Sequence, residues 1–233
     1  MNPAIKKILT WVVFPVVILL LVYLTVASIM KPVNFNKQKA FRETIAVQRL
    51  QDIRTLQVAY KGFYGKYADQ IDSLKDYYNN GDMIIVMQVG SLDDSAAVAH
   101  TEAVKKKAPR GKKITSTDLY QMYQAGDKNL VFSVETKIPV RDTLLRRDGF
   151  SIDDTFVIPF SGGEPVEMEA VIKPVSGVQV PLFEARMPYK KLLKGLDNQL
   201  RINLDAECRD RNRYEGLQVG SVSAPNNNAG NWE

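Results

Sequence analysis

The feature that most constrains this chain is an uncharged apolar run from Ile8 to Met30. Folded as a helix with a rise of about 1.5 Å per residue, these roughly 23 residues are about 35 Å long. That length exceeds the hydrocarbon core of a bilayer, which is about 30 Å thick. Because a helix satisfies its own backbone hydrogen bonds, it is also the conformation that lipid permits. The run therefore predicts a single-pass membrane anchor over residues 8–30, after a short tail of residues 1–7.

The length of the apolar run also separates an anchor from a signal peptide. A cleaved signal has an apolar region of about 7–15 residues, so we expect this longer segment to be kept. Proline is tolerated in lipid-embedded helices, and Pro15 should therefore cost little. The residues that we expect to form the anchor are Ile8, Trp11, Val12, Phe14, Ile18, Leu21, Tyr23 and Ile29.

The charges beside the anchor give opposing indications of its orientation. The positive charges that follow it outnumber Lys6 and Lys7, which precede it, and this count favours a cytoplasmic domain. A short basic tail before one apolar run is, however, the usual layout of a signal anchor. We expect the bulk of the chain to be periplasmic or otherwise extracytoplasmic.

Composition argues against several kinds of chemistry. The net charge of +5 falls to 5 − 2 = +3 without Lys6 and Lys7, which is nearly balanced and gives no reason to expect nucleic-acid binding. Cys208 is the only cysteine and His100 the only histidine, so a zinc site with Cys and His ligands is not expected. The chain has no phosphate loop and no dinucleotide-binding glycine motif. We expect no catalytic residues, no metal and no cofactor.

A second helix is expected next to the membrane, within a helical segment of residues 31–80. Lys31 and Pro32 should end or bend the anchor, because proline disfavours helical geometry in the residue before it. Apolar residues then recur at spacings of three and four over residues 36–63, which predicts an amphipathic helix. That helix either packs on its own domain or pairs with a partner as a coiled coil. The candidate interface residues on it are Phe41, Ile45, Leu56 and Phe63.

Residues near the end of this helix give a family resemblance. Tyr60, Gly65, Lys66 and Tyr67, followed by Ile71 to Leu74, lie after an apolar helix that continues into an amphipathic one. This arrangement resembles type IV pilins and the pseudopilins of type II secretion, over about residues 8–78. The resemblance implies a small antiparallel sheet after the helix. The glycine and glutamate of the family's peptidase site are absent, so a bitopic scaffold subunit that keeps its anchor is equally compatible.

Residues 81–222 predict one α+β domain with an antiparallel sheet. A buried strand is expected at 83–89, further strands at 130–138 and 156–160, and a hairpin of strands at 166–172 and 178–185 around Ser176-Gly177. Short helices are expected at 93–104, 115–123 and 188–197. Residues 199–207 fit either a helix or a strand. The asparagine-rich residues 223–233 are expected to form a flexible tail, unless Trp232 docks on another surface, and Trp232 is also a candidate for a partner interface.

One basic run interrupts this domain. Its residues repel one another and therefore favour a loop. The loop either is simply solvated or contacts anionic lipid or an acidic partner. Nucleic acid is disfavoured because no aromatic residues alternate with the cations. The run comprises Lys105, Lys106, Lys107, Arg110, Lys112 and Lys113.

These observations favour a non-enzymatic role. The most consistent hypothesis is a bitopic structural subunit of an envelope-spanning assembly, either pilus-like or part of a secretion apparatus. Its expected partners are membrane lipid and other protein subunits, in a homo- or hetero-oligomer. The alternative is a membrane-tethered extracytoplasmic domain that binds a ligand or hydrolyses a substrate, in which the carboxylates of Asp153-Asp154 or of Asp205, Glu207 and Asp210 would converge.

Overall fold

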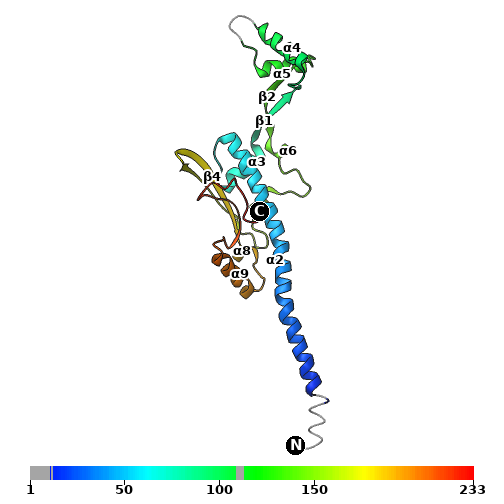
Figure 1. Ribbon diagram of the computed structural model, residues 1–233, viewed down its shortest axis with the longest axis vertical. Helices are drawn as coiled ribbons and strands as arrows, with labels where there is room; N and C mark the ends of the chain where they lie inside the picture. Colours follow the sequence, from blue (N-terminus) through cyan, green and yellow to red (C-terminus); the bar gives the residue numbers. More distant parts are fainter. Residues whose placement is uncertain (1–10, 12, 109–112) are drawn as a thin grey trace, which may run out of the picture. The chain divides into compact units, whose positions relative to one another are not determined.

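The computed structural model describes residues 11, 13–108 and 113–233 as an α+β protein with antiparallel sheets (Figure 1). It divides into two compact units. The anchor unit comprises Met1–Arg54, Asp69–Ile71 and Ser151–Glu233, and the ribbon unit comprises Thr55–Ala68 and Asp72–Phe150. The elements are α2 (Phe14–Tyr64), α3 (Ile71–Asn80), β1 (Asp82–Val89), α4 (Ser95–Lys106), α5 (Ser116–Gln124), β2 (Phe132–Pro139), α6 (Val140–Thr143), α7 (Ile152–Thr155), β3 (Glu167–Val175), β4 (Val178–Pro188), α8 (Tyr189–Leu192), α9 (Asn198–Asp210) and β5 (Gly216–Gly220).

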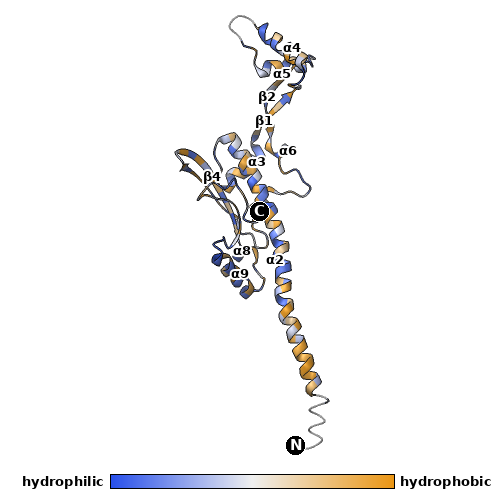
Figure 2. Cartoon of the chain, in the orientation of Figure 1, coloured by the Kyte–Doolittle hydropathy of each residue, from blue (hydrophilic) through white to orange (hydrophobic). Residues whose placement is uncertain are grey.

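The anchor and the expected second helix form one continuous helix, α2, and its first part is long and apolar enough to cross a membrane. The large apolar side chains before Pro32 are exposed, and Figure 2 shows this stretch as mostly hydrophobic. Trp11, Phe14, Ile18, Leu21, Tyr23 and Ile29 are among them, whereas Ile8 and Val12 lie outside the described residues.

Of the two outcomes expected at Lys31-Pro32, an end of the helix is wrong, because α2 continues through Pro32. A proline inside a helix removes one backbone donor, whereas its fixed φ suits the helical conformation. The helix ends at Tyr64, where Gly65 has a φ of +75° and donates its N–H to the Lys61 carbonyl at 2.8 Å. This left-handed glycine is a common helix terminator.

A three-stranded antiparallel sheet in the order β3-β4-β5 forms the centre of the anchor unit. The predicted hairpin is confirmed, with Ile172 opposite Pro181. Its turn residues, Ser176 and Gly177, have φ values of +51° and +83°, and two positive values are typical of a type I′ turn. The centre of β4 is buried on both faces over residues 182–185, with Phe183 fully enclosed. Residues 199–207 belong to helix α9.

Two expectations for this unit are wrong. Residues 156–160 form no strand, and Val157 makes only an isolated bridge to Pro165. Residues 223–233 are not a free tail, because they hydrogen-bond to β5. Asn231 accepts from the Gln218 N–H at 3.1 Å and donates to the Gly216 carbonyl at 2.8 Å. Its amide side chain therefore satisfies backbone groups that an edge strand would otherwise expose.

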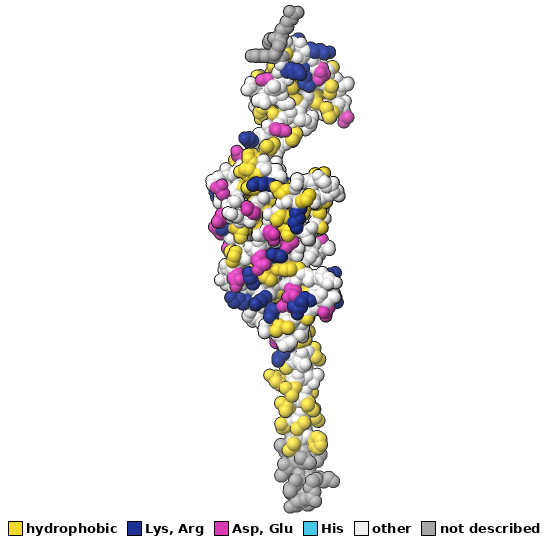
Figure 3. Space-filling view, turned by 90° about the vertical axis from the view of Figure 1, so that its left-hand side faces the viewer, with side chains coloured by type: hydrophobic (Ala, Val, Ile, Leu, Met, Phe, Trp, Pro, Cys, Tyr) yellow, Lys and Arg dark blue, Asp and Glu magenta, His cyan; other side chains and the backbone are white. Residues whose placement is uncertain are grey.

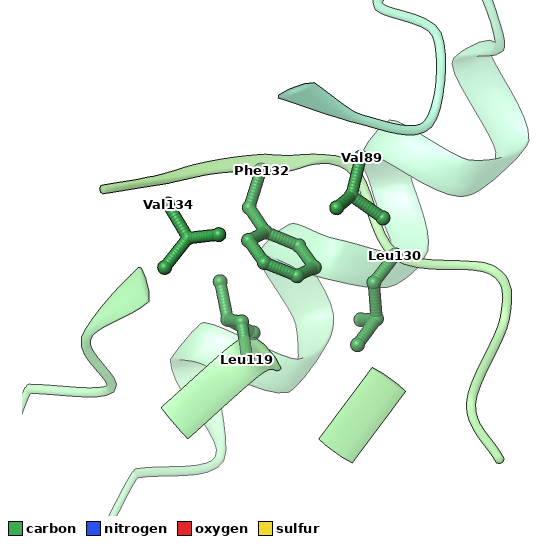
Figure 4. Packing of buried hydrophobic residues seen from close by; sticks show 5 residues of the cluster. All are labelled: Val89, Leu119, Leu130, Phe132 and Val134. Carbon is green, nitrogen blue, oxygen red and sulfur yellow. The ribbon is translucent and has the colours of Figure 1, made fainter. Parts of the chain in front are cut away.

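The ribbon unit is built around a two-stranded antiparallel ribbon of β1 and β2. Its small core, shown in Figure 4, brings together residues from both strands, α5 and the segment before β2: Val89, Leu119, Leu130, Phe132 and Val134. The expectation that 83–89 is a buried strand is wrong for its first part, since Ile84 and Val86 are exposed. The short helices agree with prediction, and Thr115 and Asp118 form a capping box at the start of α5.

An aromatic cluster in the ribbon unit surrounds Tyr77 of α3. The Tyr77 ring centroid lies 5.3 Å from that of Tyr60, 5.9 Å from Tyr64 and 6.4 Å from Phe63. The Tyr77 hydroxyl is buried and has no hydrogen-bond partner in the described part of the chain. Burial, followed by the nearby Tyr64 and Asp82, raises the pKa of Tyr77 to about 12.

Tyr77→Phe should therefore stabilise the ribbon unit by about 1 kcal/mol, because it removes a buried hydroxyl that is left unpaired. It should also change the response to alkali. Between the ordinary tyrosine pKa near 10 and the folded value of about 12, the unfolded chain releases the Tyr77 proton and the folded chain keeps it. Stability supplied by this group is thus lost as pH rises through that range. Urea unfolding at pH 8 and pH 11 would check both effects, and lower stability of the variant at pH 8 would contradict them.

Candidate functional site

The single histidine and the single cysteine of the sequence both lie in the part of the chain that the structure describes. The described residues contain no cluster of three or more His, Cys, Asp or Glu that could hold a metal ion. His100 is exposed and its Nε2 lies 2.9 Å from Asp127 Oδ2, a contact that lowers the pKa of Asp127. Burial, with Asp205 and Glu207 nearby, raises the pKa of Cys208, which makes the thiol a poorer nucleophile at neutral pH.

The carboxylates that the sequence offered for a cleft lie on two separate helices, α7 and α9. In the short helix α7, the backbone N–H of Asp154 donates to Ser151 Oγ at 3.3 Å. Asp205 is buried on α9 and accepts a hydrogen bond from Arg201 on the same helix. Glu207 pairs with Arg211 at 2.8 Å, one turn further along α9. These contacts are those of capped and salt-bridged helices.

A different feature of the anchor unit stands out, the loop from Ile158 to Glu164. Its ends are joined by a hydrogen bond of 2.9 Å from the Ile158 N–H to the Glu164 carbonyl. Ser161 is fully buried, and its Oγ donates to the Ile158 carbonyl at 2.8 Å and accepts from the Glu164 N–H at 2.9 Å. Lys194 Nζ donates to the Ser161 carbonyl at 2.9 Å. The hydrogen bonds of the buried Ser161 thus stabilise one conformation of the loop.

This loop presents a phenyl ring to solvent on a strained backbone. Phe160 has a φ of +60° and remains 47% exposed. Left-handed backbone costs a bulky residue roughly 1–2 kcal/mol, and such strain is found preferentially at functional positions. The ring lies 6.1 Å from that of Phe41 on α2, which is itself 58% exposed.

Arg42, next to Phe41 on α2, lies over the Phe160 ring. Its Nη1 donates to the carbonyls of Leu192 at 3.0 Å and Lys194 at 2.9 Å, just after α8. Its guanidinium carbon lies 4.6 Å from the centroid of the Phe160 ring. Burial lowers the pKa of Arg42, and within the described residues it forms no ion pair with a carboxylate. We call Phe41, Arg42 and Phe160 the aromatic patch.

The predicted interface residues have different surroundings. Phe41 is exposed and belongs to the aromatic patch, whereas Ile45 and Phe63 are half-buried. Leu56 is fully buried within the chain itself, so its assignment to a partner interface is wrong. Trp232 is half-buried and borders a cavity of about 240 Å³ together with Tyr189 and Cys208.

Sequence analysis missed Phe160 because it placed this residue in a strand. The signal that was present is the Ser161-Gly162-Gly163 sequence after it. Both glycines have positive φ values, which glycine adopts without steric cost. A phenylalanine directly before such a turn is a candidate for exposure on a loop.

The basic run lies at the end of α4 and before α5. Lys105, Lys106, Lys107 and Lys113 are exposed, whereas Arg110 and Lys112 lie outside the described residues. Lys105 pairs with Glu102 at 3.0 Å. Lys107 and Lys113 border a groove of about 640 Å³ whose other walls include Val104, Ile114 and Met122.

Comparison with protein families, with curated proteins and with solved structures gave no match.

Proposed function

We propose that this chain is a non-enzymatic, single-pass structural subunit of an envelope-spanning assembly, pilus-like or part of a secretion apparatus, with its bulk outside the cytoplasm. In this proposal the first part of α2 anchors the subunit, and the aromatic patch binds a neighbouring protein subunit. The observation that carries the proposal is the aromatic patch: two exposed phenyl rings, one on strained backbone, beside a guanidinium that forms no ion pair with a carboxylate of the described residues.

The composition of the patch supports a protein partner. Aromatic residues and arginine are enriched in protein interfaces and often dominate their binding energy. The rings need no induced ordering, because Phe160 is fixed by the Ser161 hydrogen bonds and Phe41 lies within a helix. A preorganised surface loses less conformational entropy when it binds.

The position of the patch supports a partner that also resides at the membrane. Phe41 and the anchor belong to one helix, and Phe41 follows Met30 by about 16 Å at the usual helical rise. A subunit bound there would contact this chain at a defined height above the bilayer. The rigid helix would thus fix the geometry between anchor and partner, as a scaffold requires.

The test is to extract the full-length protein gently from its native membrane and to determine the mass of the intact particle. We expect a particle much heavier than the 26.2 kDa chain. Phe41→Ala combined with Phe160→Ala should lower the partner's affinity at least tenfold and leave mainly the single chain. The matched control is Val178→Ala at the hairpin turn, where the side chain is also exposed, and it should leave the particle intact.

Phe160→Gly separates loss of binding from loss of folding. Glycine relieves the left-handed strain, so this variant should be at least as stable as the natural chain while binding its partner more weakly. If both variants keep the full particle mass, the patch is not the interface. If the natural chain itself is extracted as a lone monomer, the tethered ligand-binding or hydrolytic domain becomes the better hypothesis.

A further inference from the structure

A groove of about 440 Å³ in the anchor unit lies between the first part of α2 and the start of α9. One wall carries Leu24, Ala27, Ser28, Lys31 and Pro32, and the other carries Asp197, Gln199 and Leu200. A second hollow of about 310 Å³ adjoins it, since Lys31 and Asp197 border both. The start of α9 is therefore placed against residues of the membrane anchor itself.

The level of this groove along α2 follows from helix geometry. Leu24 precedes Met30, the end of the apolar run, by about 9 Å of helix. Each headgroup layer of a bilayer is roughly 5–7 Å thick outside a core of about 30 Å. The groove thus extends from the outer part of the hydrocarbon core into the headgroup layer. Figure 3 shows the corresponding change, from mainly yellow side chains on the anchor to mixed dark blue and magenta ones on the folded part.

The residues that line the groove change from apolar to charged along α2, from Leu24 toward Lys31. Its deeper end is formed by Leu24 and Ala27, and its shallower end by the charged side chains of Lys31 and Asp197. Lys31 is exposed and forms no ion pair with any described residue. Asp197 caps α9 by accepting from the Leu200 N–H at 3.0 Å, and its carboxylate stays exposed. An apolar end, with a cation and an anion together at the other end, matches the acyl chain and the phosphate and amine of a zwitterionic phospholipid.

A further observation concerns α9. Ile202, in its second turn, is 41% exposed, in a helix that otherwise exposes mainly polar and charged side chains. Leu200 borders the groove, and Ile202, two residues further along α9, lies on another face of the helix, outside the groove. An apolar side chain exposed at the level of the headgroups is stabilised by contact with the acyl boundary.

We infer that this groove binds a zwitterionic phospholipid and seats the first two turns of α9 in the headgroup layer. The inference rests on the proposed membrane anchor. Lys31 contacts the lipid phosphate, Asp197 contacts the amine, and Leu24 with Ala27 contacts the acyl chain. The contact fixes how the anchor unit is rotated about the axis of α2 relative to the membrane plane. It thereby also fixes the direction in which the aromatic patch faces.

The first test measures depth in the full chain, reconstituted in nanodiscs of phosphatidylethanolamine and phosphatidylcholine. Spin labels are placed by Leu20→Cys, Ile202→Cys and Val178→Cys in a Cys208→Ser background, and their accessibility to oxygen and to a water-soluble nickel chelate is compared. We expect lipid exposure at residue 20, interfacial values at 202 and water exposure at 178. Water exposure at 202 with lipid exposure at 20 overturns the groove inference alone. Water exposure at 20 overturns the anchor and the inference together.

The second test measures lipid retention. Native mass spectrometry of the detergent-released chain, with added phosphatidylethanolamine as the probe, should show bound lipid that Lys31→Glu reduces at least fivefold. The matched control is Lys37→Glu, an exposed lysine on α2 that does not border the groove. Equal retention in both variants overturns the assignment of the phosphate to Lys31 and, with it, the site.

Discussion

Replacing Gln57 with leucine should destabilise the ribbon unit by about 2–5 kcal/mol, because it leaves two buried backbone groups without partners. Gln57 is fully buried on α2. Its Nε2 donates to the Ala68 carbonyl at 2.8 Å, and its Oε1 accepts from the Ala68 N–H at 2.9 Å. Ala68 follows the end of α2 in a buried stretch with no regular secondary structure, so these backbone groups lack helix or sheet partners.

Gln57→Glu tests the same contact with a side chain of nearly the same size but different hydrogen-bonding groups. The carboxylate keeps one acceptor for the Ala68 N–H but sets a second oxygen against the Ala68 carbonyl. It should therefore destabilise the unit about as much as leucine does, despite its nearly identical size. Urea unfolding of the full chain in detergent, followed by hydrogen exchange of residues 55–68 and 72–150, would localise the effect.

Gln70→Leu provides the matched control for both variants. Gln70 lies in the same connection but is exposed, and its replacement should change stability by less than about 0.5 kcal/mol. A loss of stability at Gln57 no larger than at Gln70 would mean that Ala68 finds water or other partners, and that this contact does not hold the end of α2.

The parts of the fold that the sequence predicts well are those with short-range causes. Thr115 and Asp118 are three residues apart and form their capping box within one turn, and Ser176-Gly177 makes a hairpin turn with adjacent residues. The periodicity of α2 likewise requires only neighbours along a helix. Such features depend on local geometry, which spacing and residue type reveal.

The remaining features depend on contacts between residues distant in the sequence. The Gln57 contact with Ala68, the Asn231 contacts with β5 and the position of Phe160 beside Phe41 carry no local pattern. One of the two rings of the aromatic patch was therefore predictable: Phe41 follows from helix periodicity, whereas Phe160 requires the folded loop. Leu56 shows the converse, because periodicity places it on an apolar face without indicating whether the chain itself covers that face.

Gly220→Ala is the second change for which we expect a large effect, a loss of about 2–5 kcal/mol in the anchor unit. Gly220 ends β5 with a φ of +73°, opposite Glu184 of β4. A Cβ at this position would lie 2.3 Å from the Phe183 carbonyl oxygen, which is backbone of the central strand. Because β4 is the central strand and is held on both sides, the end of the edge strand β5 must move away from it.

The matched control is Gly177→Ala in the turn between β3 and β4. Gly177 also has a left-handed φ, of +83°, but nothing lies within 4 Å of its added Cβ. Its cost is thus the backbone strain alone, about 1 kcal/mol. The difference between the two variants in urea unfolding measures the close approach of β5 to β4. Equal losses would assign the whole effect to the left-handed backbone.

The same substitution should also release the C-terminal residues. The Gly220 N–H donates to the Ala229 carbonyl at 3.0 Å, so moving the end of β5 removes one of the bonds that hold residues 223–233. Hydrogen exchange of residues 226–231 should therefore rise in Gly220→Ala and stay unchanged in Gly177→Ala. Because Asn231 bonds to Gly216 and Gln218 instead, exchange near Trp232 should rise less than at Ala229. A uniform rise would indicate that the tail is released as one piece, with Gly220 as its main attachment.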